Sequence, residues 1–192
     1  MNWTKFKESI TDVERKLVDT YREIQMDLGF PKRILEVGSG WGLFTRSMLE
    51  TPDTQVTTVD KIQPEFLKSF LFNTEGFDDR INMLTGESSE ILPDLIQTGE
   101  RFDLVMVDGS HKYEDVAIDL RLAWELADVV LVDDVFHKDN FVPNTFIEVG
   151  EHTPKDFEYG VAQALWEFMK LAKPEYVEFF PVGSGGLMLM KK

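Results

Sequence analysis

The chain has no cysteine, no apolar run long enough to span a membrane and comparatively few basic residues. Without cysteine it has no disulfide, no thiolate nucleophile and no sulfur ligand for a metal. Its first residues lack the apolar core of a signal peptide, so we expect a cytosolic protein that does not enter a membrane. Acidic residues outnumber basic ones by 35 to 20, and the resulting net charge of −15 would repel a nucleic acid. A small molecule is therefore the expected partner.

The sequence does contain enough apolar residues to build one folded domain. Of its 192 residues, 43% are hydrophobic and 29% are charged, which is typical of a globular protein. There is no repeat, linker or low-complexity segment, so residues 1–192 are expected to form a single domain.

The most informative segment is a short apolar run followed by three glycines, Arg33-Ile34-Leu35-Glu36-Val37-Gly38-Ser39-Gly40-Trp41-Gly42. Apolar residues then recur at helical spacing, which predicts a strand, a tight turn and a helix. Glycine lets the backbone turn sharply and approach a ligand closely, and the N–H groups that open a helix attract a carboxylate or phosphate. Leu43 stands where a dinucleotide fingerprint would have its last glycine, which disfavours NAD. The acidic Glu36 favours a ligand that carries an ammonium group.

The N-terminal segment has one apolar residue at every third or fourth position. This spacing predicts a helix over most of residues 1–28, ended by Gly29 and Pro31. We expect the helix to cover the protein's own sheet. Two alternatives remain open, a homo-oligomer formed through this helix and a cap over the mouth of the active site.

The rest of the chain alternates between predicted strands and predicted helices. Strands are expected at 55–60, 81–85, 102–109, 129–134, 176–180 and 187–190, and helices at 64–72, 89–97, 113–127 and 160–170. Such alternation implies a parallel sheet with right-handed crossovers. The connection at 181–186 is too short for a parallel crossover, so the last two strands must pair antiparallel. The predicted fold is an α/β, Rossmann-like, doubly wound and mostly parallel seven-stranded sheet, with an antiparallel C-terminal hairpin and an extra N-terminal helix.

Acidic residues close several of the predicted strands. Asp60, followed by Lys61, lies about 20 residues beyond the glycine turn, where a carboxylate accepts hydrogen bonds from the ribose of a nucleoside. Asp108 and Asp133 each end a buried strand, and neighbouring strands lie about 4.8 Å apart, so these two carboxylates and Asp134 are expected to converge. Three acids so close need a proton or a cation between them, and oxygen ligands with open positions suit Mg²⁺ better than Zn²⁺. Asp108 alone could instead only fix the adjacent loop.

The pattern Glu36-x-Gly38-x-Gly40-x-Gly42 resembles motif I of the class I S-adenosylmethionine-dependent methyltransferases. With Val107-Asp108-Gly109-Ser110-His111-x-Tyr113, Val132-Asp133-Asp134 and the helix from Gly160, it is similar to the macrocin O-methyltransferase group and related small-molecule O-methyltransferases. More distantly it resembles catechol O-methyltransferase, whose final metal ligand is asparagine where this chain has Asp134. The resemblance covers residues 32–170.

The resemblance implies S-adenosylmethionine as cofactor and a set of residues that bind it. Within this set, the segment around Glu87 would contact the amine of adenine. Alternatively, Glu87 is an ordinary acidic residue at a helix start. That set is Glu36, Gly38, Ser39, Gly40, Trp41, Gly42, Asp60, Lys61, Gly86, Glu87, Ser88 and Asp108. It also implies Mg²⁺ on Asp108, Asp133 and Asp134, where the metal would grip two oxygens of the substrate and lower the pKa of its hydroxyl.

Two histidines are candidate general bases, because neutral imidazole accepts a hydroxyl proton near pH 7. His111 closely follows Asp108. His137 lies at the start of residues 136–159, a long aromatic segment that we expect to be a lid or a substrate wall.

The function expected from the sequence is Mg²⁺-assisted methyl transfer from S-adenosylmethionine to a small hydroxylated acceptor. A nucleotide-dependent oxidoreductase is one alternative, disfavoured by Leu43 and by the terminal hairpin. A non-catalytic S-adenosylmethionine-binding partner protein is a second. An aminopropyltransferase is a third, and its usual acidic catalytic signature is not recognisable here.

Overall fold

The computed structural model describes residues 3–61, 63–135, 160–182 and 185–192. The predicted lid at 136–159, including His137, lies outside the described residues. The helices of the described segments are α1 (Trp3–Ser9), α2 (Asp12–Asp27), α3 (Leu43–Leu49), α4 (Pro64–Asn73), α5 (Ser88–Gln97), α6 (Tyr113–Leu126), α7 (Val161–Ala172) and the short 3₁₀ helix η1 (Asp78–Arg80). None of them is both long and apolar enough to cross a bilayer.

The strands form one sheet with the order β3-β2-β1-β4-β5-β7-β6. Their bounds are β1 (Arg33–Val37), β2 (Gln55–Asp60), β3 (Ile81–Thr85), β4 (Leu104–Val107), β5 (Val129–Val132), β6 (Tyr176–Phe180) and β7 (Leu187–Lys191). The first five strands are parallel, and β7 runs antiparallel between β5 and β6. This confirms the predicted Rossmann-like sheet with its antiparallel hairpin. The strand order reverses between β1 and β4, and ligands of such sheets bind outside the carboxyl ends of the strands at that point.

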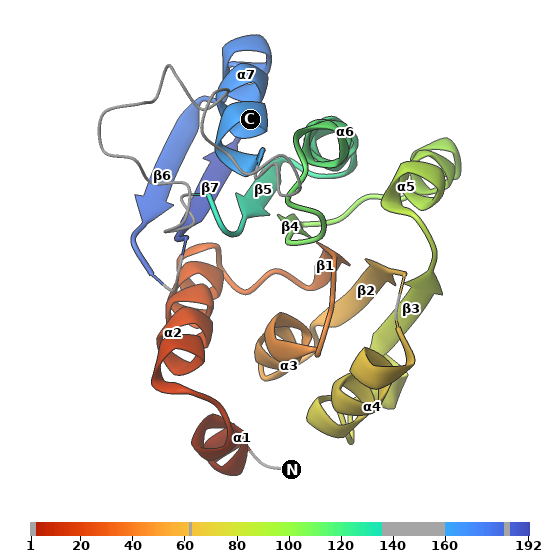
Figure 1. Cartoon of the computed structure of the whole chain (residues 1–192), viewed down its shortest axis with the longest axis vertical. Helices are drawn as coiled ribbons and strands as arrows, with labels where there is room; N and C mark the ends of the chain where they lie inside the picture. Colours follow the sequence, from red (N-terminus) through yellow and green to blue (C-terminus); the bar gives the residue numbers. More distant parts are fainter. Residues whose placement is uncertain (1–2, 62, 136–159, 183–184) are drawn as a thin grey trace.

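Helices cover the sheet on both faces (Figure 1), because successive side chains of a strand point to opposite sides. On β1, Ile34 packs into one apolar cluster with residues of α2 and α3. The next residue, Leu35, packs into the other cluster with residues of α5, α6 and α7. Both side chains are fully buried, as expected for strands of a parallel sheet covered on both faces.

The N-terminal segment differs from the predicted single helix over 1–28. It forms two helices, α1 and α2, because Thr11 starts a new helix with a capping box. Its hydroxyl accepts a hydrogen bond from the N–H of Glu14 at 3.2 Å, and the Glu14 carboxylate accepts one from the N–H of Thr11 at 2.7 Å. Tyr21 and Ile24 of α2 are buried against the sheet, which confirms that this helix covers the protein's own core. A dimer formed through it stays a prediction.

Candidate functional site

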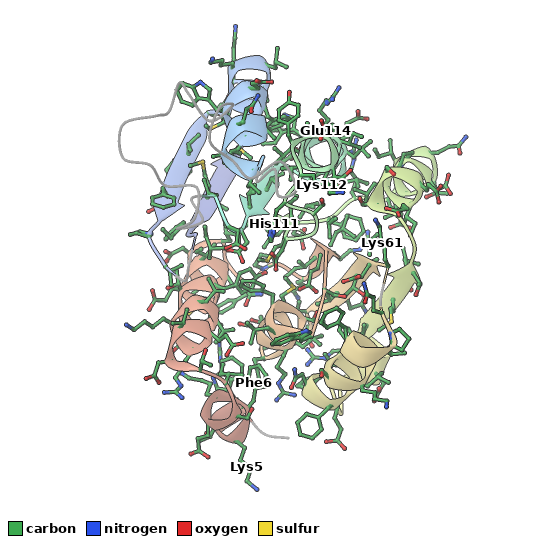
Figure 2. All side chains as sticks on the ribbon, viewed as in Figure 1. Lys5, Phe6, Lys61, His111, Lys112 and Glu114 are labelled. Atoms are coloured by element: carbon green, nitrogen blue, oxygen red, sulfur yellow. The ribbon has the colours of Figure 1, made fainter. Side chains whose placement is uncertain are left out.

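A cavity of about 820 Å³ opens at the carboxyl ends of β1, β2 and β4, beside the point where the strand order reverses. Its volume lies within the range of about 300–1,000 Å³ that is usual for small-molecule sites. Most of the residues predicted to bind a cofactor line it: Gly38, Ser39, Gly40, Trp41, Asp60, Lys61, Gly86, Glu87, Ser88 and Asp108. His111, Asp133 and Asp134 line it as well. Figure 2 shows His111 near β4 and β5, and Lys61 toward β3.

The glycine turn after β1 forms the floor of this cavity. A Cβ added to Gly38 would lie 2.2 Å from the carbonyl oxygen of Asp108, so only glycine lets the ends of β1 and β4 come this close. A Cβ added to Gly40 would meet nothing within 4 Å. Both residues have a positive φ, +86° and +46° respectively, which glycine adopts without strain. The turn therefore presents bare backbone to the cavity.

Asp60, the last residue of β2, holds this turn in place. Its Oδ2 accepts hydrogen bonds from the backbone N–H of Gly40 at 2.7 Å and of Ser39 at 2.8 Å. The hydroxyl of Ser39 donates to the same oxygen at 3.3 Å. Asp60 also lines the cavity. The residue predicted to bind the ribose therefore also fixes the glycine turn beside which a nucleoside would lie.

Two predicted cofactor residues, Glu36 and Gly42, are not part of the cavity wall. Glu36 is fully buried and accepts a hydrogen bond from the hydroxyl of Thr45 in α3. Burial raises the pKa of Glu36 to about 8, and the nearby charge of Asp60 adds to the shift. A Cβ added to Gly42 would lie 3.0 Å from the ring of Phe70, so this glycine allows α3 and α4 to pack closely. Both residues support the turn from behind.

At the β3 side of the cavity, Lys61 forms an ion pair with Glu87 at 2.7 Å. Beside them lies Asp119 of α6, a cavity residue that the sequence analysis did not find. Asp119 accepts a hydrogen bond from the side chain of Ser88, and burial raises its pKa to about 6. Its Oδ1 has no hydrogen-bond partner among the described residues, although the residue is only 2% exposed. The sequence feature that could have identified Asp119 is its position three residues after the apolar Val116, on the same face of the predicted helix.

At the β5 side, the structure brings Asp108, His111 and Asp134 together. One possible ligand atom from each lies within 4.8 Å of the others, and His111 Nε2 is 3.2 Å from Asp134 Oδ2. Asp108 and Asp134 of the predicted trio belong to this group together with His111, and Asp133 lines the same cavity. Metal binding by the predicted trio stays a prediction. Burial raises the pKa of Asp108 well above its ordinary range, and the charges of Asp133 and Asp134 raise it further. Burial also raises the pKa of Asp133, to about 7, with Asp134 as the second cause.

A family model described as a methyltransferase domain matches residues 35–135. The chain belongs to this methyltransferase family. A comparison of the sequence with curated proteins found no match.

Solved methyltransferases share the fold of this methyltransferase domain. An O-methyltransferase from Bacillus cereus, solved with SAH, is 20% identical with a TM-score of 0.66, over 100% of this chain and 82% of that one. The O-methyltransferase TomG from Streptomyces achromogenes, solved with SAM, is 22% identical with a TM-score of 0.66, over 91% and 78% of the two chains. The SAH-bound methyltransferase PaMTH1 from Podospora anserina is 20% identical with a TM-score of 0.64, over 98% and 85%.

Part of the cavity of this methyltransferase domain comes from outside the matched residues. Val13, Glu14 and Leu17 of α2 line the cavity, and Val13 is 55% exposed although it belongs to the apolar stripe of the helix. The helix α2 therefore contributes to the cavity as well as to the core.

Two aromatic rings line the cavity as well. Trp41, also 55% exposed, stacks on Phe66 of α4 with ring centroids 6.1 Å apart.

Proposed function

We propose that this methyltransferase domain binds S-adenosylmethionine (SAM) and methylates the hydroxyl oxygen of a small acceptor. The observation that carries the proposal is the glycine turn, held by Asp60 and open at Gly40, at the reversal point of a methyltransferase sheet. The solved structures with SAM or its product S-adenosylhomocysteine (SAH) support the same cofactor.

The residues of the cavity fit such a cofactor in their chemistry. A ribose offers hydroxyl donors, and Asp60 is the carboxylate that would accept them. The backbone at Gly38 and Gly40 leaves room for the amino-acid part of the cofactor, and the segment 86–88 would lie against the base. When bound, the cofactor supplies a methyl group that is activated for transfer. The protein's part is to bind and orient both reactants and to exclude water.

We further propose that a divalent cation assists the reaction, held by Asp108, His111 and Asp134. A cation would stabilise the ionised form of Asp108, whose pKa is raised by burial and by the charges of Asp133 and Asp134, and would lower the pKa of an acceptor hydroxyl bound to it. Mg²⁺ prefers oxygen ligands, so the imidazole in this group makes Mn²⁺ the natural comparison. A histidine that ligates the cation through Nε2 cannot take the hydroxyl proton with the same atom. The metal-ligand and general-base roles of His111 therefore exclude each other.

Titration calorimetry with SAM and SAH tests the proposal, with NADH as the competing nucleotide. We expect both adenosyl ligands to bind and NADH to give no heat. Repeating the titrations with Mg²⁺, with Mn²⁺ and with a chelator tests the cation separately. If NADH binds and the adenosyl ligands do not, the proposed function is wrong. If SAM binding and methyl transfer are indifferent to every divalent ion, only the cation is wrong.

A further inference from the structure

The two loops that carry His111 and Asp134 rest on glycines from the C-terminal part of the chain. His111 lies between β4 and α6, and Asp134 lies just after β5. The glycines come from the residue before α7 and from the segment 185–186 before β7, and both α7 and β7 pack next to β5 (Figure 1). Both glycine positions lie outside residues 35–135, which match the methyltransferase family.

Gly185 touches the backbone of Asp134. A Cβ added to Gly185 would lie 2.6 Å from the Cα of Asp134 and 2.8 Å from its Oδ1, closer than a real Cβ comes to either atom. The carbonyl oxygen of Gly186 accepts a hydrogen bond from the N–H of Val135 at 3.2 Å. The segment 185–186 therefore contacts Asp134 and also binds the residue that follows it.

Asp134 needs this support because its backbone is strained. Its φ is +52°, in the left-handed region. Aspartate adopts this region more readily than most residues, but the conformation still costs free energy and persists only where the surrounding structure enforces it. With this backbone, Asp134 Oδ2 lies 3.2 Å from His111 Nε2. The contacts of the segment 185–186 are in the right place to enforce the conformation.

Gly160, the residue before α7, holds the His111 loop in a similar way. Its N–H donates a hydrogen bond to the carbonyl oxygen of His111 at 2.6 Å. A Cβ added to Gly160 would lie 2.2 Å from the Cα of Tyr113, so only glycine lets α7 begin this close to the loop. The hydroxyl of Tyr113 also donates a hydrogen bond to the carboxylate of Glu167 in α7 at 2.5 Å. The His111 loop is thus bound to α7 at its backbone and at the side chain of Tyr113.

The φ of these two glycines does not explain why they are glycines. Neither residue has a φ in the left-handed region, and that of Gly160 is −101°. The φ alone would therefore permit alanine at both positions. The missing side chain serves the close contact with the neighbouring loop.

We propose that Gly160 and Gly185 are positioning residues that hold His111 and Asp134 against each other. The inference rests on the proposed function, in which this pair joins Asp108 around a cation. Neither glycine lines the cavity, so both act through the residues that they contact. Their contribution matters because a site residue displaced by more than about 0.5 Å leaves the productive geometry.

Two readouts on the whole protein test the inference, the ring signals of His111 by NMR without metal and the affinity for Mn²⁺ by calorimetry. Asp134→Asn shows how the His111 signals change when the neighbouring carboxylate is removed. We expect Gly185→Ala and Gly160→Ala to move these signals in the same direction. Both variants should also weaken Mn²⁺ binding by about ten-fold or more, as is usual when the support of a metal ligand is lost. Their affinity for SAM should stay close to that of the wild type.

Gly99→Ala is the matched control. Gly99 has a φ of +78° and an added Cβ would meet nothing within 4 Å, so alanine there costs stability through the backbone alone. This variant should keep the His111 signals and the Mn²⁺ affinity of the wild type. Tyr113→Phe is a milder variant for use if the alanine variants fail to fold, because it removes only the hydroxyl that binds Glu167. It should move the His111 signals in the same direction by a smaller amount.

The outcomes separate this inference from the proposed function. Unchanged His111 signals in every positioning variant that folds, judged by circular dichroism, overturn the inference. Equal changes in Gly99→Ala also overturn it, because lost stability alone would then explain them. A wild type that binds SAM but no Mn²⁺ contradicts the proposed cation, and one that binds no SAM contradicts the proposed function. In both cases the NMR comparison still decides whether the glycines position the pair.

Discussion

Asp60 serves the glycine turn and the proposed ribose at the same time. Replacing it with alanine removes an acceptor for the ribose and also frees the N–H groups of Ser39 and Gly40 that fix the turn. We expect Asp60→Ala to weaken SAM binding by about 1–3 kcal/mol, measured by calorimetry. Asp60→Asn keeps one oxygen acceptor, so its affinity for SAM should lie between that of Asp60→Ala and that of the wild type. Asp79→Ala, an exposed acid in η1, is the control, and equal affinities of Asp60→Ala and the wild type would show that the ribose lies elsewhere.

Glu36 gives a prediction about stability and pH. Its pKa is raised in the folded state from an ordinary value of 4.5 to about 8, mainly by burial, so folding takes up a proton between these two values. The free energy of unfolding therefore falls as pH rises from about 4.5 to 8, by an amount on the order of 5 kcal/mol. Glu36→Gln cannot ionise and still offers Thr45 an oxygen. Thermal unfolding of both proteins should show the variant gaining stability relative to the wild type across this window, and parallel curves would contradict the shift.

Among the elements, α2 begins with a capping box whose second member, Glu14, lines the cavity. Thr11→Ala removes the hydroxyl that accepts from the Glu14 N–H, while Thr11→Ser keeps it. We expect the alanine variant to lose about 1 kcal/mol of unfolding free energy in urea, and the serine variant to lose much less. Because Glu14, Val13 and Leu17 all line the cavity, a frayed first turn would also loosen the wall. Equal stabilities of the two variants would show that the cap contributes nothing.

The break before α2 shows where sequence patterns conflict. The apolar stripe runs through Ile10 and Val13 without interruption, which predicts one helix. The capping-box signal of Thr11 and Glu14 lies within that stripe and decides the backbone locally, since an N-cap residue has extended rather than helical geometry. The stripe nevertheless identified the buried face in the second half of α2, where Tyr21 and Ile24 pack against the sheet, whereas Val13 of the same stripe is exposed at the cavity.

For the whole molecule, the alternation of strands and helices was sufficient to predict the sheet and its antiparallel end. The sequence could not show that β7 would be inserted between β5 and β6, because strand order depends on long-range pairing. Most of the predicted cofactor residues line one cavity, since the carboxyl ends of parallel strands meet at one edge, and their binding of a cofactor stays a prediction. The sequence predicted that Asp133 and Asp134 both join Asp108, and the structure groups Asp134 with Asp108 and His111, while Asp133 also lines the cavity.

The net charge of −15 complicates a test of the proposed cation, because any salt stabilises such a chain by screening its repulsion. Thermal unfolding in MgCl₂ or MnCl₂ should therefore be compared with KCl at the same ionic strength. A specific ion adds about 2.7 kcal/mol to the free energy of unfolding when its concentration is about 100 times its Kd.

We expect this excess in the wild type and in Glu125→Gln, an exposed acid of α6 outside the cavity. Asp134→Asn should lose it, because the variant removes one carboxylate of the group that contains Asp108 and His111. If Asp134→Asn keeps the extra stability in MgCl₂ or MnCl₂, the ion binds elsewhere. If the wild type is no more stable in these salts than in KCl, the proposed cation is contradicted.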